Sequence, residues 1–405
     1  MNKVAAYFSS LKDYNASFWM LSIHMFLFFS SFNMLIPEMN EYITTLGGAD
    51  YKWMILGLWT IAAAISRPLS GKIADNVSRK SVMYFGVAVS VIISFLYPFF
   101  ITVTGFLMLR FLHGFSTGFQ PTGATALVAD VIPQGKRGEA MGIFGVTIAL
   151  GFSMGQFMGS IVKSAAGIDG LFITVGILGL VSMVMIFFIS EDKKAIEQNA
   201  AERGYTTFFQ KVIPRLDELI GPEVAQPAII TFIYTNITAI YFFMVPEVST
   251  YLGIENKGAF FGINIFIVIA VRFASGKLVD KIGARKNIMA GLITLMIATM
   301  ITGTAQNPTQ FMISALVFGA GTAIISPAVM AWTADLSNPK YKGRGMGTMF
   351  IMLELGFLSG NYFTQLIYNN QEGNVFNAFF FGFSMCGAAL IYMFFTRRTR
   401  QAIYN

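Results

Sequence analysis

Ionisable side chains stand inside stretches of the sequence that are otherwise apolar. They are His24, Arg67, Arg110, His113, Arg272 and Glu354. A charged side chain in the hydrocarbon of a bilayer costs about 2.5–3.5 kcal/mol on insertion scales, so each of these groups requires a partner or a function. Histidine ordinarily titrates near neutral pH, and a carboxylic acid in an apolar site can take up and release a proton. The pattern therefore indicates proton or ion binding within a membrane.

One polar stripe follows the segment 104–130. Arg110 and Thr117 are seven residues apart and share a helix face, and His113 and Gln120 lie roughly 60–80° round the same helix. We expect Arg110 to act in proton coupling or in binding an anionic group, with a structural anchor to helix ends as the alternative. His113 is a second candidate proton carrier.

Glu354 is the one acid that we expect deep in the bilayer. Its spacing to Asn361 puts both side chains on one helix face, with Gly356 and Gly360 roughly opposite. The polar side is therefore expected to face a cavity and the glycine side a neighbouring helix. We expect Glu354 to hold a proton or a cation, with a static hydrogen bond or ion pair as the alternative.

Further polar and aromatic residues could line a cavity for an amphiphilic aromatic substrate. Four of them are Tyr234, Asn236, Tyr241 and Trp332, for which plain packing is the alternative role. His24 and Asn33 are also candidates, but they are nine residues apart and hence on opposite faces of a straight helix. One of these two is expected to be structural.

The composition places the chain in a bilayer. Of its 405 residues, 55% are hydrophobic and only 12% are charged, which is too few polar groups to cover a soluble globule of this size. The net charge of +7 comes mostly from the termini and alternate loops, and only Lys52, Lys163 and Lys257 fall in the other loops. That bias places both termini in the cytoplasm and gives no reason to expect nucleic acid as a partner.

Several classes of protein are disfavoured by what the sequence lacks. The single cysteine, Cys386, leaves no disulfide framework and no cysteine-based metal site. No phosphate-binding loop of the Gly-x-x-x-x-Gly-Lys-(Ser/Thr) type occurs, which disfavours ATP-driven transport. No nucleophile constellation stands out either, so we expect neither an enzyme nor a cofactor.

Because a membrane span needs about 20 apolar residues, the sequence divides into twelve predicted helices. They lie near 17–44, 53–75, 81–101, 104–130, 138–163, 168–190, 226–251, 258–280, 287–304, 308–335, 343–368 and 373–397. The polar stretch 191–225 is predicted to be a cytoplasmic linker between an N-terminal bundle, 1–190, and a C-terminal bundle, 226–405. Apolar residues at helical spacing from Phe208 to Ile220 predict an amphipathic segment, which lies in the membrane interface or packs against the helix ends.

The two predicted bundles are copies of one repeat. The stretch 67–80 returns at 272–286, with Gly71 and Gly276 205 positions apart, and Gly151 and Gly155 recur as Gly356 and Gly360 at the same offset. The chain is therefore predicted to be a duplicated unit of about 200 residues. Glycines four residues apart also predict close approach of a neighbouring helix.

The repeated stretch resembles the loop motif of the major facilitator superfamily, Gly-x-x-x-Asp-(Arg/Lys)-x-Gly-(Arg/Lys)-(Arg/Lys). The matching residues are Gly71, Asp75, Arg79 and Lys80 in the first copy, and Gly276, Asp280, Arg285 and Lys286 in the second. In that family the motif forms charge pairs that latch the cytoplasmic side. The residues similar in placement to the rest of that network are Asp130 and Arg137. Asp335 and Arg344 are similarly placed in the second copy of the repeat. Arg67 and Arg272, one turn before the motif, are expected to serve as gates or anchors.

Two further motifs resemble a drug:proton antiporter-like branch. Arg110-x-x-His113-Gly114 is similar to the Arg-x-x-Gln-Gly motif of proton-coupled members, in which this helix lines the central cavity. Gly151-x-x-x-Gly155-Gln156-x-x-Gly159 is similar to the antiporter motif, with Gln156 in place of its proline. Gln156 is therefore a further cavity candidate.

The resemblance implies an all-α membrane protein of twelve helices in two pseudo-symmetric six-helix bundles, working by alternating access. It implies proton-coupled export of a small amphiphilic compound, with no cofactor beyond the proton. The replacement at Gln156 leaves open nutrient uptake by symport or facilitated diffusion, and a non-transporting sensor on this fold is a third alternative. We expect a multi-pass monomer in the lipid bilayer of the plasma membrane, or of the inner membrane in a bacterium, with a small-molecule substrate.

Overall fold

The structure is a computed structural model that describes residues 14–132, 137–202, 204–214, 220–337 and 342–396. Over these ranges the chain consists of helices and short connections, without a β-strand. The all-helical architecture that the sequence predicted is therefore confirmed for the described residues.

The first half of the chain contributes the helices α2 to α7. Their bounds are α2 Ala16–Asn33, α3 Ile36–Thr45, α4 Lys52–Asn76, α5 Arg79–Leu96, α6 Val103–Val131 and α7 Arg137–Phe187, with 3-10 turns η2 Ala49–Tyr51 and η3 Tyr97–Phe99. The predicted helix 17–44 is divided between α2 and α3, where Pro37 stands in the first turn of α3. Proline cannot donate a backbone hydrogen bond, so it is tolerated at the start of a helix and breaks one that would continue through it.

The element α7 contains the two predicted helices 138–163 and 168–190, one on each side of Gly167. The chain changes direction within it at Gly167, whose φ of 71° and ψ of −177° are not helical. Glycine adopts such a conformation without steric cost, so the turn needs almost no connecting loop.

The second half of the chain contributes α10 to α15, after two short linker helices. Their bounds are α8 Lys193–Glu202, α9 Phe208–Val212, α10 Ala225–Tyr251, α11 Ala259–Ile282, α12 Ala284–Gly303, α13 Pro308–Leu336, α14 Lys342–Tyr368 and α15 Val375–Phe395, with η5 Pro222–Val224 and η6 Glu372–Asn374. The linker helices α8 and α9 pack against α4, while Phe208 and Phe209 at the start of α9 stay exposed.

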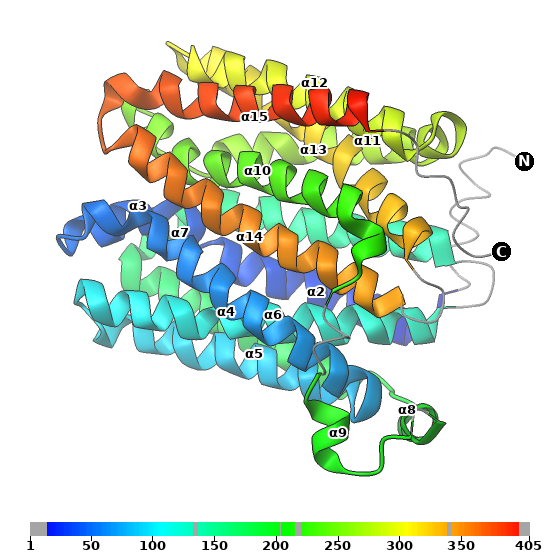
Figure 1. Ribbon diagram of the computed structural model, residues 1–405. Coiled ribbons are helices and arrows are strands. Elements are labelled where there is room, and N and C mark those ends of the chain that lie inside the picture. The colour runs from blue at the N-terminus through cyan, green and yellow to red at the C-terminus, as the bar shows by residue number, and fades with distance from the viewer. Residues whose placement is uncertain (1–13, 133–136, 203, 215–219, 338–341, 397–405) are drawn as a thin grey trace, which may run out of the picture.

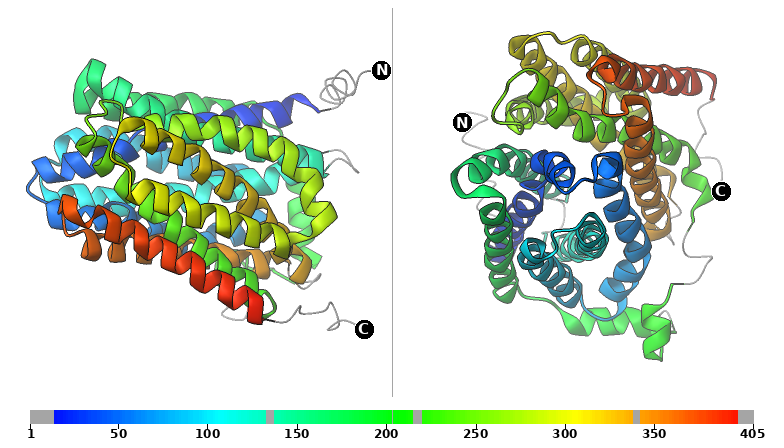
Figure 2. Two further views of the ribbon diagram at one scale, coloured as in Figure 1. Left: turned by 90° about the horizontal axis from the view of Figure 1, so that it is seen from above. Right: turned by 90° about the vertical axis from the view of Figure 1, so that its left-hand side faces the viewer.

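The long helices run along one common direction, with α3 at one end of the molecule and α8 and α9 at the other (Figure 1). Seen along the helices, the first half of the chain (blue to green) and the second half (light green to red) form two neighbouring groups (Figure 2). The groups meet through α4 with α14, α7 with α11 and α3 with α10.

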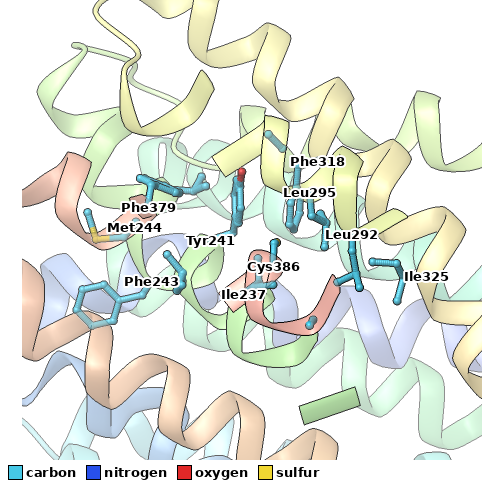
Figure 3. Close-up of a cluster of buried hydrophobic side chains, with 14 of the residues drawn as sticks. Ile237, Tyr241, Phe243, Met244, Leu292, Leu295, Phe318, Ile325, Phe379 and Cys386 are labelled. Carbon is cyan, nitrogen blue, oxygen red and sulfur yellow. The ribbon is translucent and has the colours of Figure 1, made fainter. Parts of the chain in front are cut away.

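Each half has its own apolar core. The second half builds one cluster from α10 to α15, in which the rings of Tyr241 and Phe318 stack with centroids 3.9 Å apart and Cys386 is fully buried (Figure 3). The clusters of the first half draw their buried members from residues 14–189. The apolar cores are therefore not shared between the halves, apart from peripheral contacts such as that of Trp53.

The outer surface of the helices is apolar as well. Eight helical segments of the described chain are long and apolar enough to cross a membrane. Side chains such as Phe187, Phe394 and Phe395 are 73%, 76% and 77% exposed. Such a surface would be unfavourable in water and suits the hydrocarbon of a bilayer.

Glycines set the distance between neighbouring helices. A Cβ atom at Gly151 or Gly155 of α7 would collide with the backbone of α2 at Phe26 or Ser30, and one at Gly159 would collide with Met34, directly after α2. The second half repeats the arrangement, because a Cβ at Gly356 or Gly360 of α14 would collide with α10 at Phe232 or Asn236. The predicted close approach is therefore confirmed, and in both copies of the repeat.

We predict that Gly155→Ala lowers the thermal unfolding midpoint in detergent. The added methyl group would push α7 away from the Ser30 carbonyl, and such overpacking costs about 1–3 kcal/mol. Gly387→Ala in α15 is the matched control, because no described atom lies within 4 Å of a Cβ placed there. We expect the control to be neutral or stabilising, since alanine favours helix over glycine. Equal midpoints for the two variants would contradict the packing argument.

Candidate functional site

A buried ion pair joins the two halves of the chain midway along their helices. The guanidinium of Arg67 on α4 donates to Glu354 Oε1 on α14 through Nε at 2.8 Å and through Nη2 at 2.6 Å. The side chains are 19% and 6% exposed. The ring of Phe350 lies 4.9 Å from the guanidinium carbon of Arg67, so an aromatic face covers the cation as well.

The depth of this pair follows from its position in the two helices. At 1.5 Å per residue, Arg67 lies about 22 Å from the first residue of α4 and about 14 Å from the last. Glu354 lies about 18 Å from the first residue of α14 by the same measure. The only titratable acid expected deep in the bilayer is thus paired, and its partner is an arginine that the sequence placed at the helix boundary as a gate or anchor.

Arg110 lies inside the first half, with no exposed area. Its Nε donates to the carbonyl of Ile55 at 3.2 Å and its Nη1 to the hydroxyl of Tyr97 at 3.3 Å. Its guanidinium lies 4.1 Å from the ring centroid of Trp59. These contacts hold α6 against α4 and η3, as a structural anchor would.

His113, one turn further along α6, belongs to the same cluster. Its Nε2 is 3.0 Å from Ser90 Oγ and its Nδ1 is 3.1 Å from the Tyr97 hydroxyl. Its ring stacks on Trp59 with centroids 5.0 Å apart, and Trp59 Nε1 donates to Thr117 Oγ1 at 2.5 Å. The expectation that this stripe faces a cavity is corrected here, because Trp59 and Tyr97 cover it within the first half.

His24 and Gln120 meet in a second polar cluster inside the first half. His24 Nε2 lies 2.6 Å from Gln120 Nε2, and His24 Nδ1 lies 2.8 Å from Ser182 Oγ and 2.9 Å from the Ser182 carbonyl. His24 and Gln120 are both fully buried. This cluster joins α2, α6 and α7, so the structure places these two cavity candidates in the interior of one half.

The remaining cavity candidates are spread over several places. In the first half, Gln156 Nε2 is 3.4 Å from Asn33 Oδ1. In the second half, Asn236 Nδ2 donates to Ser359 Oγ at 2.6 Å, and the hydroxyl of Tyr241 is hydrogen-bonded to Thr302 inside the core. Asn361 Nδ2 donates to the carbonyl of Phe357 in its own helix. Tyr234 and Trp332 are half-buried beside that core. Within the described chain, the predicted cavity residues therefore do not converge on one site.

The first copy of the loop motif lies where α4 passes into α5. Arg79 Nη1 forms an ion pair with Asp130, as the resemblance implied. Lys80 Nζ donates to the carbonyl of Ile189 at 2.6 Å. Gly71 and Asp75 lie in the last turns of α4, where Asp75 is exposed.

Glu191 completes this region, although the sequence analysis assigned it no role. Its carboxylate accepts from the backbone N–H groups of Arg79 at 2.5 Å and Lys80 at 3.1 Å, and from Ser78 Oγ at 2.8 Å. A carboxylate at the first N–H groups of a helix satisfies donors that have no partner within the helix. Ser78 is a typical N-cap residue and predicts the start of a helix. It does not indicate which distant acid binds there.

The second copy of the motif is described only in part. Arg285 Nη2 donates to the Thr396 carbonyl at 2.5 Å, and Arg344 lies 3.4 Å from Glu223. Lys286 and Asp335 are exposed. The side chains of Arg137 and Asp280 and the surroundings of Gly276 lie outside the described part of the chain.

At the α3 end, the two halves are joined by ion pairs that cross in both directions. Lys52 of the first half bonds to Glu247 Oε1 of the second half at 2.8 Å, with side chains 8% and 13% exposed. Lys257 of the second half pairs with Glu41 of the first. Asn40 adds a hydrogen bond to Glu247 at 3.1 Å.

The third lysine of this end, Lys163, bonds to both Glu38 and Glu41 at 2.8 Å. These are the three lysines that the charge count singled out, and each is paired. Lys52 and Lys257 are 205 positions apart, which is the offset of the repeat. We refer to Glu38, Glu41, Lys52, Lys163, Glu247 and Lys257 as the α3-end charge cluster.

Comparison with known proteins agrees with this architecture. The family model described as Major Facilitator Superfamily matches residues 18–302 and 228–403. Multi-drug resistance efflux pump PmrA of Streptococcus pneumoniae is 26% identical over 384 residues, which cover 90% of this chain and 91% of that protein. Multidrug resistance protein MdtG of Proteus mirabilis is 26% identical over 388 residues, which cover 93% and 94%.

Solved structures share the fold. The human organic anion transporter MFSD10 (TETRAN) matches with a TM-score of 0.70 at 16% identity, covering 93% of this chain and 98% of that one. The nucleoside transporter NupG matches with a TM-score of 0.71 at 12% identity, covering 95% and 100%. At these identities the likeness establishes the fold and not the substrate.

We predict that Tyr97→Phe destabilises the first half. The hydroxyl of Tyr97 serves both Arg110 and His113, and leaving buried polar groups without a partner costs about 1–3 kcal/mol. The thermal unfolding midpoint in detergent should fall, whereas Tyr51→Phe, at a residue that is 47% exposed, should not change it. A Tyr97→Phe protein as stable as the wild type would show that this network is not an anchor.

We also predict that Lys52→Met lowers the free energy of unfolding by about 3 kcal/mol, because Glu247 would remain as a buried charge without its counterion. The exchanged pair Lys52→Glu with Glu247→Lys should recover most of the loss. Lys193→Met on the exposed surface of α8 is the control and should change the stability by less than about 0.5 kcal/mol. If Lys52→Met and Lys193→Met were equally stable, the crossing pair would contribute nothing.

Proposed function

Because this chain belongs to the Major Facilitator Superfamily, we propose that it is a secondary active transporter that exports small amphiphilic organic compounds in exchange for protons. The ion pair between Arg67 and Glu354 carries the proposal, since it is a buried titratable contact between the two halves. The printed names of the relatives, multidrug efflux and resistance proteins, support export. Members of this family are transporters and generally not enzymes.

We propose twelve membrane spans in two six-helix bundles, 1–190 and 226–405, joined by the linker 191–225. In this arrangement α2 and α3 form one span and α7 forms two, divided at Gly167. The separate apolar cores of the two halves support the division. So does the repeat, in which glycines of α7 and α14 pack in the same way.

The protein spans a membrane several times, and we propose that its α8–α9 end and both termini are cytoplasmic. The distribution of lysine and arginine between alternate loops supports this orientation. The α3 end then faces the outside, at the plasma membrane or, in a bacterium, the inner membrane. In the present structure the α3-end charge cluster joins the halves on that side.

Glu354 is the proton carrier in this proposal. When it is ionised, the ion pair holds α4 against α14. Protonation removes the negative charge, and an arginine left without its counterion in a buried site is unfavourable by about 3–5 kcal/mol. States in which Arg67 reaches water or another partner then become favourable. Loss of the proton restores the pair, so that proton binding and the contact between the halves are coupled.

Arg110 and His113 take a positioning role in this scheme. Both have hydrogen bonds or ring contacts to other helices of the first half, so they hold α6 against α4, which also carries Arg67. Tyr234 and Trp332, which are half-buried, stay candidates for contact with the substrate. Their aromatic rings with polar tips would suit an amphiphilic compound.

We predict that Glu354→Gln abolishes proton movement driven by substrate. The measurement is the internal pH of proteoliposomes with an imposed pH gradient, challenged with a panel of amphiphilic and anionic compounds. At least one compound should move protons through the wild-type protein. Glu372→Gln, at an exposed acid before α15, is the control and should behave as the wild type.

Two outcomes would contradict this proposal. If a compound crosses equally well without a pH gradient and in Glu354→Gln, the protein is a facilitator and Glu354 carries no proton. If the compound instead accumulates against its gradient on the cytoplasmic side of oriented vesicles, the direction is uptake and not export.

A further inference from the structure

A cavity of about 200 Å³ lies at the α3 end, where the start of α4 meets the last turns of α14. Its lining residues are Asp50, Trp53, Tyr362, Gln365, Leu366 and Asn369. The first two belong to the first half of the chain and the others to the second. Trp53 is 14 residues from Arg67, or about 21 Å along α4, so this cavity is separate from the Arg67–Glu354 pair.

The lining offers negative charge, ring faces and a free acceptor. Asp50 carries the only charge among the lining residues of the described chain. The rings of Trp53 and Tyr362 meet edge to face, with centroids 5.1 Å apart. Gln365 is 7% exposed, and its Oε1 has no hydrogen-bond partner among the described residues. A buried acceptor without a donor, beside an acid and aromatic rings, favours a ligand that brings positive charge.

Neighbouring residues hold Asp50 in place without neutralising it. Asn369 and Asn370 adopt left-handed conformations, with φ of 47° and 53°, as asparagine tolerates at the end of a helix. The Asn370 side chain then donates to Asp50 Oδ1 and to the Ala49 carbonyl, both at 3.3 Å. Lys52, the nearest cation in the sequence, is bonded to Glu247 instead.

We propose that this cavity binds an organic ammonium group attached to an apolar body. The charge would lie between Asp50 and the rings of Trp53 and Tyr362, and the apolar body against Leu366, which is 57% exposed. A free organic cation and the ethanolamine headgroup of a membrane lipid share this chemistry. Because both halves line the cavity, such a ligand stabilises the arrangement in which α4 and α14 are in contact at this end.

The test is a calorimetric titration of the purified full chain in dodecyl maltoside micelles, which carry neither charge nor amine. The probe is benzylammonium, whose N–H groups can donate to Gln365 Oε1, and its neutral analogue of the same shape is ethylbenzene. We expect saturable binding of the cation only. Asp50→Asn should weaken it by up to about fivefold, since a partly exposed charge pair contributes up to about 1 kcal/mol, and Asp50→Glu should restore it.

The matched control is Asp169→Asn, which removes an exposed acid from the same end of the molecule without altering the cavity. It should bind the probe as the wild type does. The proposal is overturned if Asp50→Asn binds the probe as tightly as Asp169→Asn, if ethylbenzene binds equally well, or if binding does not saturate. Because the assay measures binding alone, it can fail or succeed independently of proton-coupled transport.

A second arm identifies the natural source of the ammonium group. Phosphatidylethanolamine or phosphatidylglycerol is added to the micelles before the titration. If only phosphatidylethanolamine weakens binding of the probe, the site takes the lipid headgroup. If neither lipid competes, it takes a free cation. Both results agree with an ammonium site.

Discussion

The constraint on which this structure depends is that a charge inside an apolar protein and its surrounding lipid must be paired. Arg67 meets Glu354, Arg110 meets Tyr97 and a carbonyl, and the lysines at the α3 end meet glutamates. Because the partners lie on different helices, satisfying each charge also fixes one helix against another. The contacts within a half are permanent supports for its fold. The contacts between halves join two units with separate cores, so they are the ones that can break without unfolding either unit.

The sequence allowed the helices to be placed because their signal is local. The apolar runs form helices, and the glycines four residues apart pack closely in both copies of the repeat. Arg79 pairs with Asp130, and the resemblance had placed both residues in one charge network without naming the pair. Local signals also misled. Pro37 divides a run that reads as one helix, whereas the two helices predicted on either side of Gly167 are both present and separated by its non-helical backbone.

The side-chain partners could not be predicted in the same way. Helical periodicity shows which residues share a face, but not what covers that face. The stripe on α6 reads as the wall of a cavity, yet Trp59 and Tyr97 from other elements cover it. Glu354 and Arg67 are far apart in the sequence. Each was identified as a charge that is costly to bury, but nothing in the sequence indicated that the two form an ion pair. Aromatic residues with a polar tip, which seek a partner when buried, were the signal that was overlooked.

The salt bridges of Lys52 and Lys257 between the two halves fit an origin of the chain by duplication. Lys52 and Lys257 occupy equivalent positions in the two repeats, and each pairs with an acid of the other half. These two acids, Glu247 and Glu41, also lie within one helical turn of equivalent positions. That is the pattern of an isologous interface, in which identical subunits exchange identical contacts across a two-fold axis. A homodimer of the single repeat would have formed both salt bridges at once. Fusion of two copies would keep both salt bridges and allow positions to differ between the halves, such as Glu354, whose equivalent in the first half is Ala149.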